Sequence, residues 1–140
     1  MNIYKFPDLC IGQEESFSVS ITEKMMEEFK SITGDINPLH NDNEFAVKTG
    51  HPGRVVYGLL TASFMSTLAG VYLPGRYSLI HTVETEFVKP VYIGDILEVN
   101  GKVVQKDENF NVIWLKVVIT NQYGKKVCRG KMRIGFLNAD

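Results

Sequence analysis

Residues 55–75 read VVYGLLTASFMSTLAGVYLPG and contain no charged side chain. The pattern predicts one helix from about Gly58 to Val71, which the Leu-Pro-Gly that follows brings to an end. Its fourteen residues, at ~1.5 Å each, give about 21 Å, enough to cross a small domain. A membrane span needs about 20 predominantly apolar residues, whereas this stretch includes glycines, a proline and several Ser and Thr hydroxyls. We therefore expect a helix that is buried on every side within a globular domain.

On the C-terminal side of this helix the hydrophobic period changes to two, which is typical of β-strands. Four strands are predicted, at Ser78–Val88, Ile96–Lys106, Val112–Asn121 and Lys126–Phe136. The connections between them are short and contain turn formers such as Gly94-Asp95 and Gly124. Short connections predict that consecutive strands are antiparallel neighbours in one sheet.

On the N-terminal side, residues 17–21 alternate between apolar and polar side chains and predict a short strand. Thr22 is placed to cap a helix that Gly34 ends. A polar loop, residues 35–42, and a short helix, residues 43–49, follow. An antiparallel sheet wrapped around one long central helix accommodates this order of elements. We therefore predict an α+β architecture of the hotdog type.

The composition fits a single globular domain, residues 1–140, with 44% apolar and 22% charged residues. The net charge of −1 argues against nucleic-acid and anionic-membrane partners, because both require a basic surface. It does not exclude a small anionic ligand held by a few local cations. Cys10 and Cys128 form no CxxC motif, and the first ten residues hold no apolar run of signal-peptide length. We therefore expect a reduced compartment, the cytoplasm.

The polar loop is the first candidate for chemistry, because it places the Asp35 carboxylate five residues before the His40 imidazole, with Pro38 between them. A carboxylate can take a proton from water, and an imidazole can hold that water and pass a proton on. Asp and Asn beside proline are also ordinary turn formers, so the spacing alone leaves a catalytic and a structural role open. The histidines show no metal-ligand spacing, and we expect no metal site.

The start of the long helix is the second candidate. The first four amides of a helix have no partner within it and carry the positive end of its dipole. Gly58 would let a ligand carbonyl approach these amides closely, as in an oxyanion hole. The alternative is that Gly58 only permits tight packing, and the residue by itself favours this simpler role.

The segment TGDINPLHNDNEFA, residues 33–46, resembles the hydratase motif of the MaoC-like dehydratases, the (R)-specific enoyl-CoA hydratases. That motif has a Gly-Asp-x-Asn-Pro-aliphatic-His core followed by Ala or Ser, and it is matched by Gly34, Asp35, Asn37, Pro38, Leu39, His40 and Ala46. The segments GRVVYG, residues 53–58, and FVKPVYIGD, residues 87–95, are similar to two further signatures of the family, in the same order. The resemblance therefore spans most of the chain.

The resemblance implies hydration of trans-2-enoyl-CoA to (R)-3-hydroxyacyl-CoA, or the reverse dehydration. Asp35 would activate water against the β-carbon, and His40 would bind that water and supply or relay the proton to the α-carbon. The N–H of Gly58 would hold the thioester carbonyl. Asn37 would orient the loop, and Ser63 would line the site.

Three further residues concern the substrate. Tyr57 departs from the family, in which His often precedes the helix glycine, and its ring would alter the acyl pocket. Arg54 and Lys89 are cations that could meet the phosphates of coenzyme A, although ordinary surface charge explains them equally well. The resemblance also implies an acyl-CoA or acyl-carrier-protein thioester as substrate, and no cofactor beyond the coenzyme A that the substrate carries. It implies a homodimer or a dimer of dimers.

Two other functions are compatible with the predicted fold. In a hotdog thioesterase, a carboxylate-activated water attacks the thioester carbonyl and releases a thiol. A non-catalytic protein would bind the acyl thioester without turnover. The pairing of Asp35 with His40 favours the hydratase over both.

Overall fold

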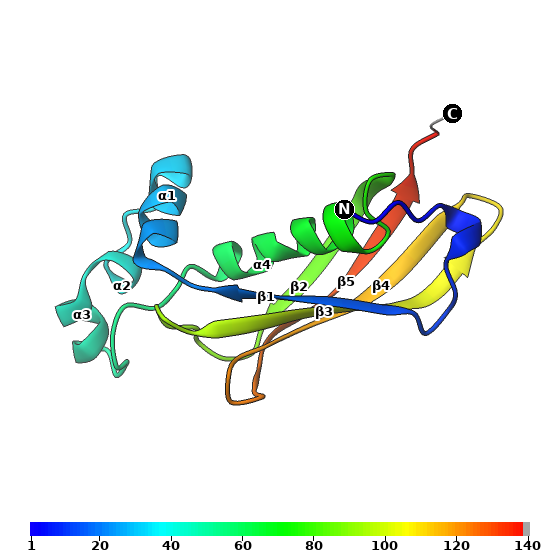
Figure 1. Cartoon of the computed structure of the whole chain (residues 1–140). Coiled ribbons are helices and arrows are strands. Elements are labelled where there is room, and N and C mark those ends of the chain that lie inside the picture. Colours follow the sequence, from blue (N-terminus) through cyan, green and yellow to red (C-terminus); the bar gives the residue numbers. More distant parts are fainter. Residues whose placement is uncertain (139–140) are drawn as a thin grey trace.

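The structure is a computed structural model that describes residues 1–138. Its sheet contains five strands (Figure 1): β1 (Glu14–Ser20), β2 (Ser78–Phe87), β3 (Ile96–Asp107), β4 (Val112–Thr120) and β5 (Lys126–Phe136). The α-helices are α1 (Glu23–Thr33), α2 (Pro38–Asn41), α3 (Asn43–Lys48) and α4 (Gly58–Thr67). A 3₁₀ turn, η1 (Phe6–Asp8), precedes β1, and a π-helical turn, η2 (Leu68–Tyr72), continues α4.

The strands lie in the order β1-β3-β4-β5-β2, and all neighbours are antiparallel. The prediction that β3, β4 and β5 are consecutive neighbours is confirmed. The prediction that β2 lies beside β3 is wrong, because β2 pairs with β5 and β3 pairs with β1. The connection between β2 and β3, residues 88–95, is not a tight turn. It runs past the residues that lead into α4, where the N–H of Val56 donates to the carbonyl of Val91 at 2.8 Å.

The core lies between α4 and the sheet, which crosses the helix on one side (Figure 1). Leu60, Met65 and Leu68 of the helix are buried against apolar side chains of the central strands. The helix approaches β3 so closely that a Cβ atom at Gly101 would lie 2.7 Å from a methyl group of Leu68. This arrangement of one long helix on a five-stranded antiparallel sheet confirms the predicted hotdog architecture.

The prediction that the long helix is buried on every side is wrong for the single chain. Leu59 is 65% exposed, and Ser63 and Ser66 are also exposed, so one side of α4 faces away from the sheet. The reason is that one sheet can cover only one side of the helix. Within residues 1–138, no helix is both long enough and apolar enough to cross a membrane.

The helices α1, α2 and α3 lie beyond one end of the sheet, near the start of α4 (Figure 1). The hydroxyl of Thr22 caps α1, and Gly34 ends it in the left-handed conformation with φ of 74°, as predicted. The segment predicted as a continuous loop contains α2, so His40 lies on a short helix. Asn37 caps this helix and Pro38 occupies its first position, where a missing N–H costs nothing.

Candidate active site

A cavity of about 370 Å³ opens beside the first turn of α4. It brings together three of the predicted site residues that lie apart in the sequence, Asp35, His40 and Gly58. The remaining lining residues come from α1, the start of α4 and the end of β2: Phe29, Thr33, Tyr57, Leu59 and Phe87. The carboxylate, the imidazole and the start of the helix therefore share one cavity.

A second cavity, of about 330 Å³, lies next to the first and shares His40, Gly58 and Phe87 with it. Most of its wall is apolar and is formed mainly by valines and by Pro90 of the segments before α4 and after β2, together with Leu39, Phe87 and Val127. Its polar side chains are His40, His51, Thr61 and Lys89. The two cavities together provide an apolar space and a small polar centre, which is the usual composition of a small-molecule site.

The Asp35 carboxylate is held by the backbone that follows it. Its Oδ1 accepts a hydrogen bond from the N–H of Asn37 at 3.0 Å, and the Asn37 side chain accepts in turn from the N–H of Leu39 at 2.9 Å. Within residues 1–138, Oδ2 of Asp35 makes no hydrogen bond, so one carboxylate oxygen stays open to a ligand. The Asn37 side chain thus helps to organise this segment, and its role in the reaction stays a prediction.

The His40 ring is fixed by a hydrogen bond from Nδ1 to the carbonyl oxygen of Val55 at 2.7 Å. Because a carbonyl can only accept, Nδ1 carries the proton, and Nε2 of the neutral ring is an acceptor. The ring also packs on Tyr57, with 4.3 Å between the ring centroids. The structure therefore determines both the tautomer and the orientation of the imidazole.

Tyr57, which directly precedes α4, contacts both the Asp35 segment and the His40 ring. Its ring is 2% exposed, and its hydroxyl donates to the backbone carbonyl of Asp35 at 2.6 Å. The same hydroxyl accepts a hydrogen bond from the Asn41 side chain at 3.0 Å. Tyr57 thus holds the backbone of Asp35 through its hydroxyl while its ring packs on His40 and forms part of the cavity wall.

The start of α4 carries unpaired donors. The carbonyl of Val55, which the N–H of Leu59 would reach in a regular helix, accepts from His40 instead. The N–H of Gly58 makes no backbone hydrogen bond within residues 1–138. A Cβ atom at Gly58 would lie only 3.1 Å from the Phe87 ring. A side chain at this position would therefore crowd the Phe87 ring, whereas glycine leaves the unpaired amide without a Cβ atom in front of it.

Arg54 interacts with its own chain. Its Nε donates to the carbonyl of His40 at 2.8 Å, and its other nitrogens pair with Glu23 and Glu27 of α1 at 3.2 and 3.4 Å. A hydrogen bond from Lys30, together with the nearby Arg54, lowers the pKa of the Glu27 carboxyl below its ordinary value. These contacts make Arg54 a link between α1 and α2, and its predicted contact with coenzyme A stays a prediction.

Of the remaining predicted residues, Lys89 lines a cavity and Ser63 does not. Lys89 is exposed and lines the second cavity, where it is available to an anionic part of a ligand. Ser63 is exposed on the uncovered side of α4, and its hydroxyl donates to the carbonyl of Leu60 at 2.6 Å. The single chain therefore does not bring Ser63 to either cavity wall described above.

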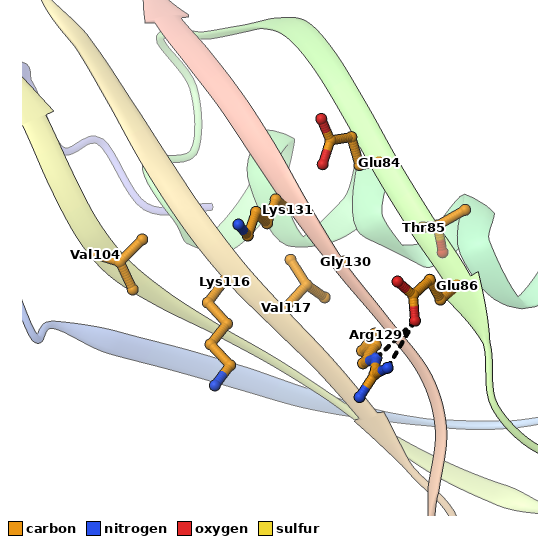
Figure 2. A pocket seen from close by; sticks show the side chains of 9 residues that line it. All are labelled: Glu84, Thr85, Glu86, Val104, Lys116, Val117, Arg129, Gly130 and Lys131. Atoms are coloured by element: carbon orange, nitrogen blue, oxygen red, sulfur yellow. Dashed lines mark hydrogen bonds and ion pairs between the residues drawn. The ribbon is translucent and has the colours of Figure 1, made fainter.

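A larger hollow, of about 600 Å³, lies over β2, β5 and β4 and extends to Val104 of β3 (Figure 2). Its charged side chains include Lys116 and Lys131, and Arg129 pairs with Glu86 at 2.7 Å. None of the predicted site residues lines it. The size of a cavity therefore does not identify the site in this chain, and the chemistry of the lining residues is the better guide.

The sequence assigns no role to several residues that line the two cavities, nor to Asn41, which supports Tyr57 behind the cavity wall. Asn41 directly follows His40 and was visible as part of the polar segment. Phe87 lay within a quoted signature, without an assigned function. Phe29 on α1 and Thr61 on α4 carry no local signal, because only the fold brings α1, β2 and α4 together. Within residues 1–138, no three His, Cys, Asp or Glu side chains are grouped to hold a metal ion.

A family model described as the MaoC like domain matches residues 10–123 of this chain. The chain belongs to the MaoC-like family. A 3-hydroxybutyryl-CoA dehydratase of Methylorubrum extorquens is 35% identical over 75% of this chain, and the match covers 67% of that protein. An (R)-specific enoyl-CoA hydratase of Aeromonas caviae is 31% identical over 88% of this chain and 92% of that protein.

The MaoC-like assignment is supported equally by solved structures. The unliganded R-hydratase of Pseudomonas aeruginosa superposes with a TM-score of 0.91 at 30% identity, covering 99% of this chain and 88% of that one. The predicted family and the hotdog fold are thereby confirmed. Hydratases and dehydratases are hydro-lyases, so the predicted enzyme class is confirmed as well.

Proposed function

We propose that this MaoC-like chain catalyses the reversible addition of water to a trans-2-enoyl thioester, giving an (R)-3-hydroxyacyl thioester. Relatives named as an (R)-specific enoyl-CoA hydratase and a 3-hydroxybutyryl-CoA dehydratase support hydration or dehydration of this substrate class. The observation that carries the proposal is the single cavity lined by Asp35, His40 and Gly58. It offers a base, an imidazole and an unpaired helix amide to one small ligand.

In the proposed step, Asp35 takes a proton from water while the water oxygen bonds to the β-carbon. The electron pair of the double bond moves toward the α-carbon and the thioester oxygen. Nε2 of neutral His40 then gains this proton from Asp35 and passes it to the α-carbon, so that both side chains return to their starting states. One water is added in total, and neither side chain is consumed.

The hydrogen bond from His40 to the carbonyl of Val55 constrains this step. With Nδ1 protonated, neutral His40 presents Nε2 as an acceptor, which suits it to hold the water. It can supply a proton only after it gains one on Nε2, or it can relay the proton that it takes from the water. The backbone hydrogen bond supports the imidazole in both states, because Nδ1 stays protonated throughout.

The Gly58 N–H is proposed to stabilise the negative charge that develops on the thioester oxygen. A single oxyanion donor is typically worth about 10²–10³-fold in kcat. The Phe87 ring lies against Gly58 in the free chain and is 52% exposed. Substrate binding would therefore displace this ring, which joins the two cavities and exposes the amide.

Lys89 is proposed to contact the phosphates of coenzyme A, because it is an exposed cation on the wall of the cavity that contains His40. A carrier protein would present the same thioester on a phosphopantetheine arm. The mechanism requires no metal and no cofactor beyond the thiol portion of the substrate. A cytoplasmic location is likewise part of the proposal.

We further propose that two copies of the chain associate through α4 and β2. The strand β2 is an edge of the sheet and pairs only with β5 within residues 1–138, and unpaired edges readily accept another strand. Large apolar side chains are exposed on the same elements: Leu59, Leu79, Val83 and Phe87. Size-exclusion chromatography with light scattering is expected to give the mass of two or four chains, and a monomer at micromolar concentration would contradict the association.

The test of the function is a pair of assays on the same sample. With crotonyl-CoA as substrate, the enoyl absorbance should fall while no free thiol is released. Thiol release would indicate the thioesterase, and tight binding without either change would indicate a non-catalytic binding protein. Acyl-CoA and acyl-carrier-protein substrates of several chain lengths should be included, and inactivity with all of them would reject the proposal.

A further inference from the structure

Thr61, in the first turns of α4, is buried without a hydrogen-bond partner. It is 2% exposed, and its Oγ1 is the one buried side-chain nitrogen or oxygen within residues 1–138 that lacks a partner. Leaving a buried hydroxyl unpaired is unfavourable, and a folded protein usually avoids it. The neighbouring space is a cavity, so a ligand is the natural candidate for the missing partner.

The position of Thr61 relates it directly to Gly58. The two residues are three apart on one helix and therefore lie on the same face. Because Cα–Cβ bonds in a helix tilt toward its N-terminus, the Thr61 side chain is directed back over the first turn. Gly58 has no side chain to occupy that space, and both residues line the cavity that contains His40.

The usual helical partner of this hydroxyl is already engaged. A buried Thr in a helix commonly bonds the carbonyl four residues earlier, which here belongs to Tyr57. That carbonyl accepts from the N–H of Leu60 at 3.0 Å and from the N–H of Thr61 itself at 3.2 Å. The hydroxyl thus remains unpaired beside the amide of Gly58, which is also unpaired.

We infer that the Thr61 hydroxyl is a second donor to the thioester carbonyl oxygen of the substrate, beside the Gly58 N–H. The inference rests on the proposed function and assigns it one further substrate-contacting residue. In the free chain the Phe87 ring lies against Gly58. Displacement of the ring by the acyl thioester gives both donors one acceptor, which becomes more negative as the enolate develops.

The variants Thr61→Val and Thr61→Ser separate this role from a structural one. Valine has the shape of threonine without the hydroxyl, so Thr61→Val should lower kcat with crotonyl-CoA by roughly 10²-fold, as for other oxyanion donors. Its unfolding temperature should stay equal or rise, because an unpaired buried hydroxyl has been removed. Thr61→Ser should retain most of kcat. The control Thr67→Val, on the same helix, should leave kcat unchanged.

Each alternative result has a definite meaning. An unchanged kcat in Thr61→Val, in an otherwise active enzyme, would overturn the inference and leave the proposed function standing. A fall in kcat that only follows a lower unfolding temperature would assign the hydroxyl to folding and also overturn it. An inactive wild-type enzyme would reject the proposed function itself, and the inference with it.

Discussion

The two ends of the helix formed by α4 and η2 differ in how their polar groups are satisfied. At the η2 end, Leu68 and Leu73 are fully buried, and the N–H of Leu73 donates to the carbonyl of Leu68 at 2.8 Å. At the start of α4, the Gly58 amide and the Thr61 hydroxyl have no partner within residues 1–138. The η2 end of the helix therefore contributes stability, whereas the start of α4 leaves hydrogen-bond donors unpaired beside a cavity.

The largest effect on kcat is expected for Asp35 and His40, which share a cavity with the start of α4. Asp35→Asn and His40→Ala should each lower kcat with crotonyl-CoA by about 10²–10⁴-fold, because each removes a group that moves a proton. Asp35 is exposed, and asparagine can still accept from the N–H of Asn37, so Asp35→Asn should fold normally. Initial rates together with thermal unfolding measure both effects. Turnover close to that of the wild type in either variant would reject the assigned roles.

At the η2 end of the helix we expect the opposite pattern, a loss of stability with little change in kcat. Leu68→Ala removes a fully buried side chain and should lower the free energy of unfolding by about 2–5 kcal/mol. Urea unfolding measures this loss, and kcat per folded molecule should stay near the wild-type value. The matched control is Ile32→Ala, whose side chain is 82% exposed and should change stability by less than about 0.5 kcal/mol. A large loss of kcat in folded Leu68→Ala would remove the distinction between the two ends.

A smaller effect is expected at Tyr57, which packs on His40 and also holds the backbone of Asp35. The variant Tyr57→Phe keeps the ring against His40 but removes the hydrogen bond to the carbonyl of Asp35. We expect kcat to fall about 10-fold, which corresponds to about 1.4 kcal/mol in the barrier, with KM nearly unchanged. Steady-state kinetics well below the unfolding temperature measure it. An unchanged kcat would show that the hydroxyl does not position Asp35.

The smallest expected effect is on the stability that Glu27 of α1 contributes through its contacts with Lys30 and Arg54. The pKa of Glu27 is lowered in the folded chain by Lys30 and Arg54, so its interactions stabilise the fold at pH values above the carboxyl's unfolded pKa. This contribution is lost as the pH falls through the folded pKa. Glu27→Gln should therefore be slightly less stable than the wild type at neutral pH and indistinguishable from it in acid. Urea unfolding at the two pH values provides the test, and a difference that persists in acid would contradict it.

Local patterns in the sequence predict most of the elements of this fold. The β5 range, Lys126–Phe136, is predicted without error because period-two alternation directly reflects a sheet with one buried face. The pairing of β2 could not be predicted, since strand neighbours depend on how residues 88–95 cross the molecule. The exposed side of α4 was also missed, because an uncharged helix looks the same whether a sheet or another copy of the chain covers it.

In the candidate site, too, some residues can be predicted from the sequence and others cannot. Asp35 and His40 are five residues apart, so one short motif contains both and the sequence reveals the pair. Phe87 and Thr61 reach the cavity from β2 and from the second turn of α4, and only the three-dimensional fold brings them to His40. The missing hydrogen bond of Thr61 is a property of its surroundings, which no local pattern encodes.

The most direct test of the Asp35 and His40 site as a hydratase centre is the stereochemistry of the product formed from crotonyl-CoA by the wild type, beside Asp35→Asn and Leu68→Ala. We expect (R)-3-hydroxybutyryl-CoA from the wild type and from the folded fraction of Leu68→Ala, and almost none from Asp35→Asn. An (S) product, a racemic mixture, or equal turnover by Asp35→Asn would contradict it.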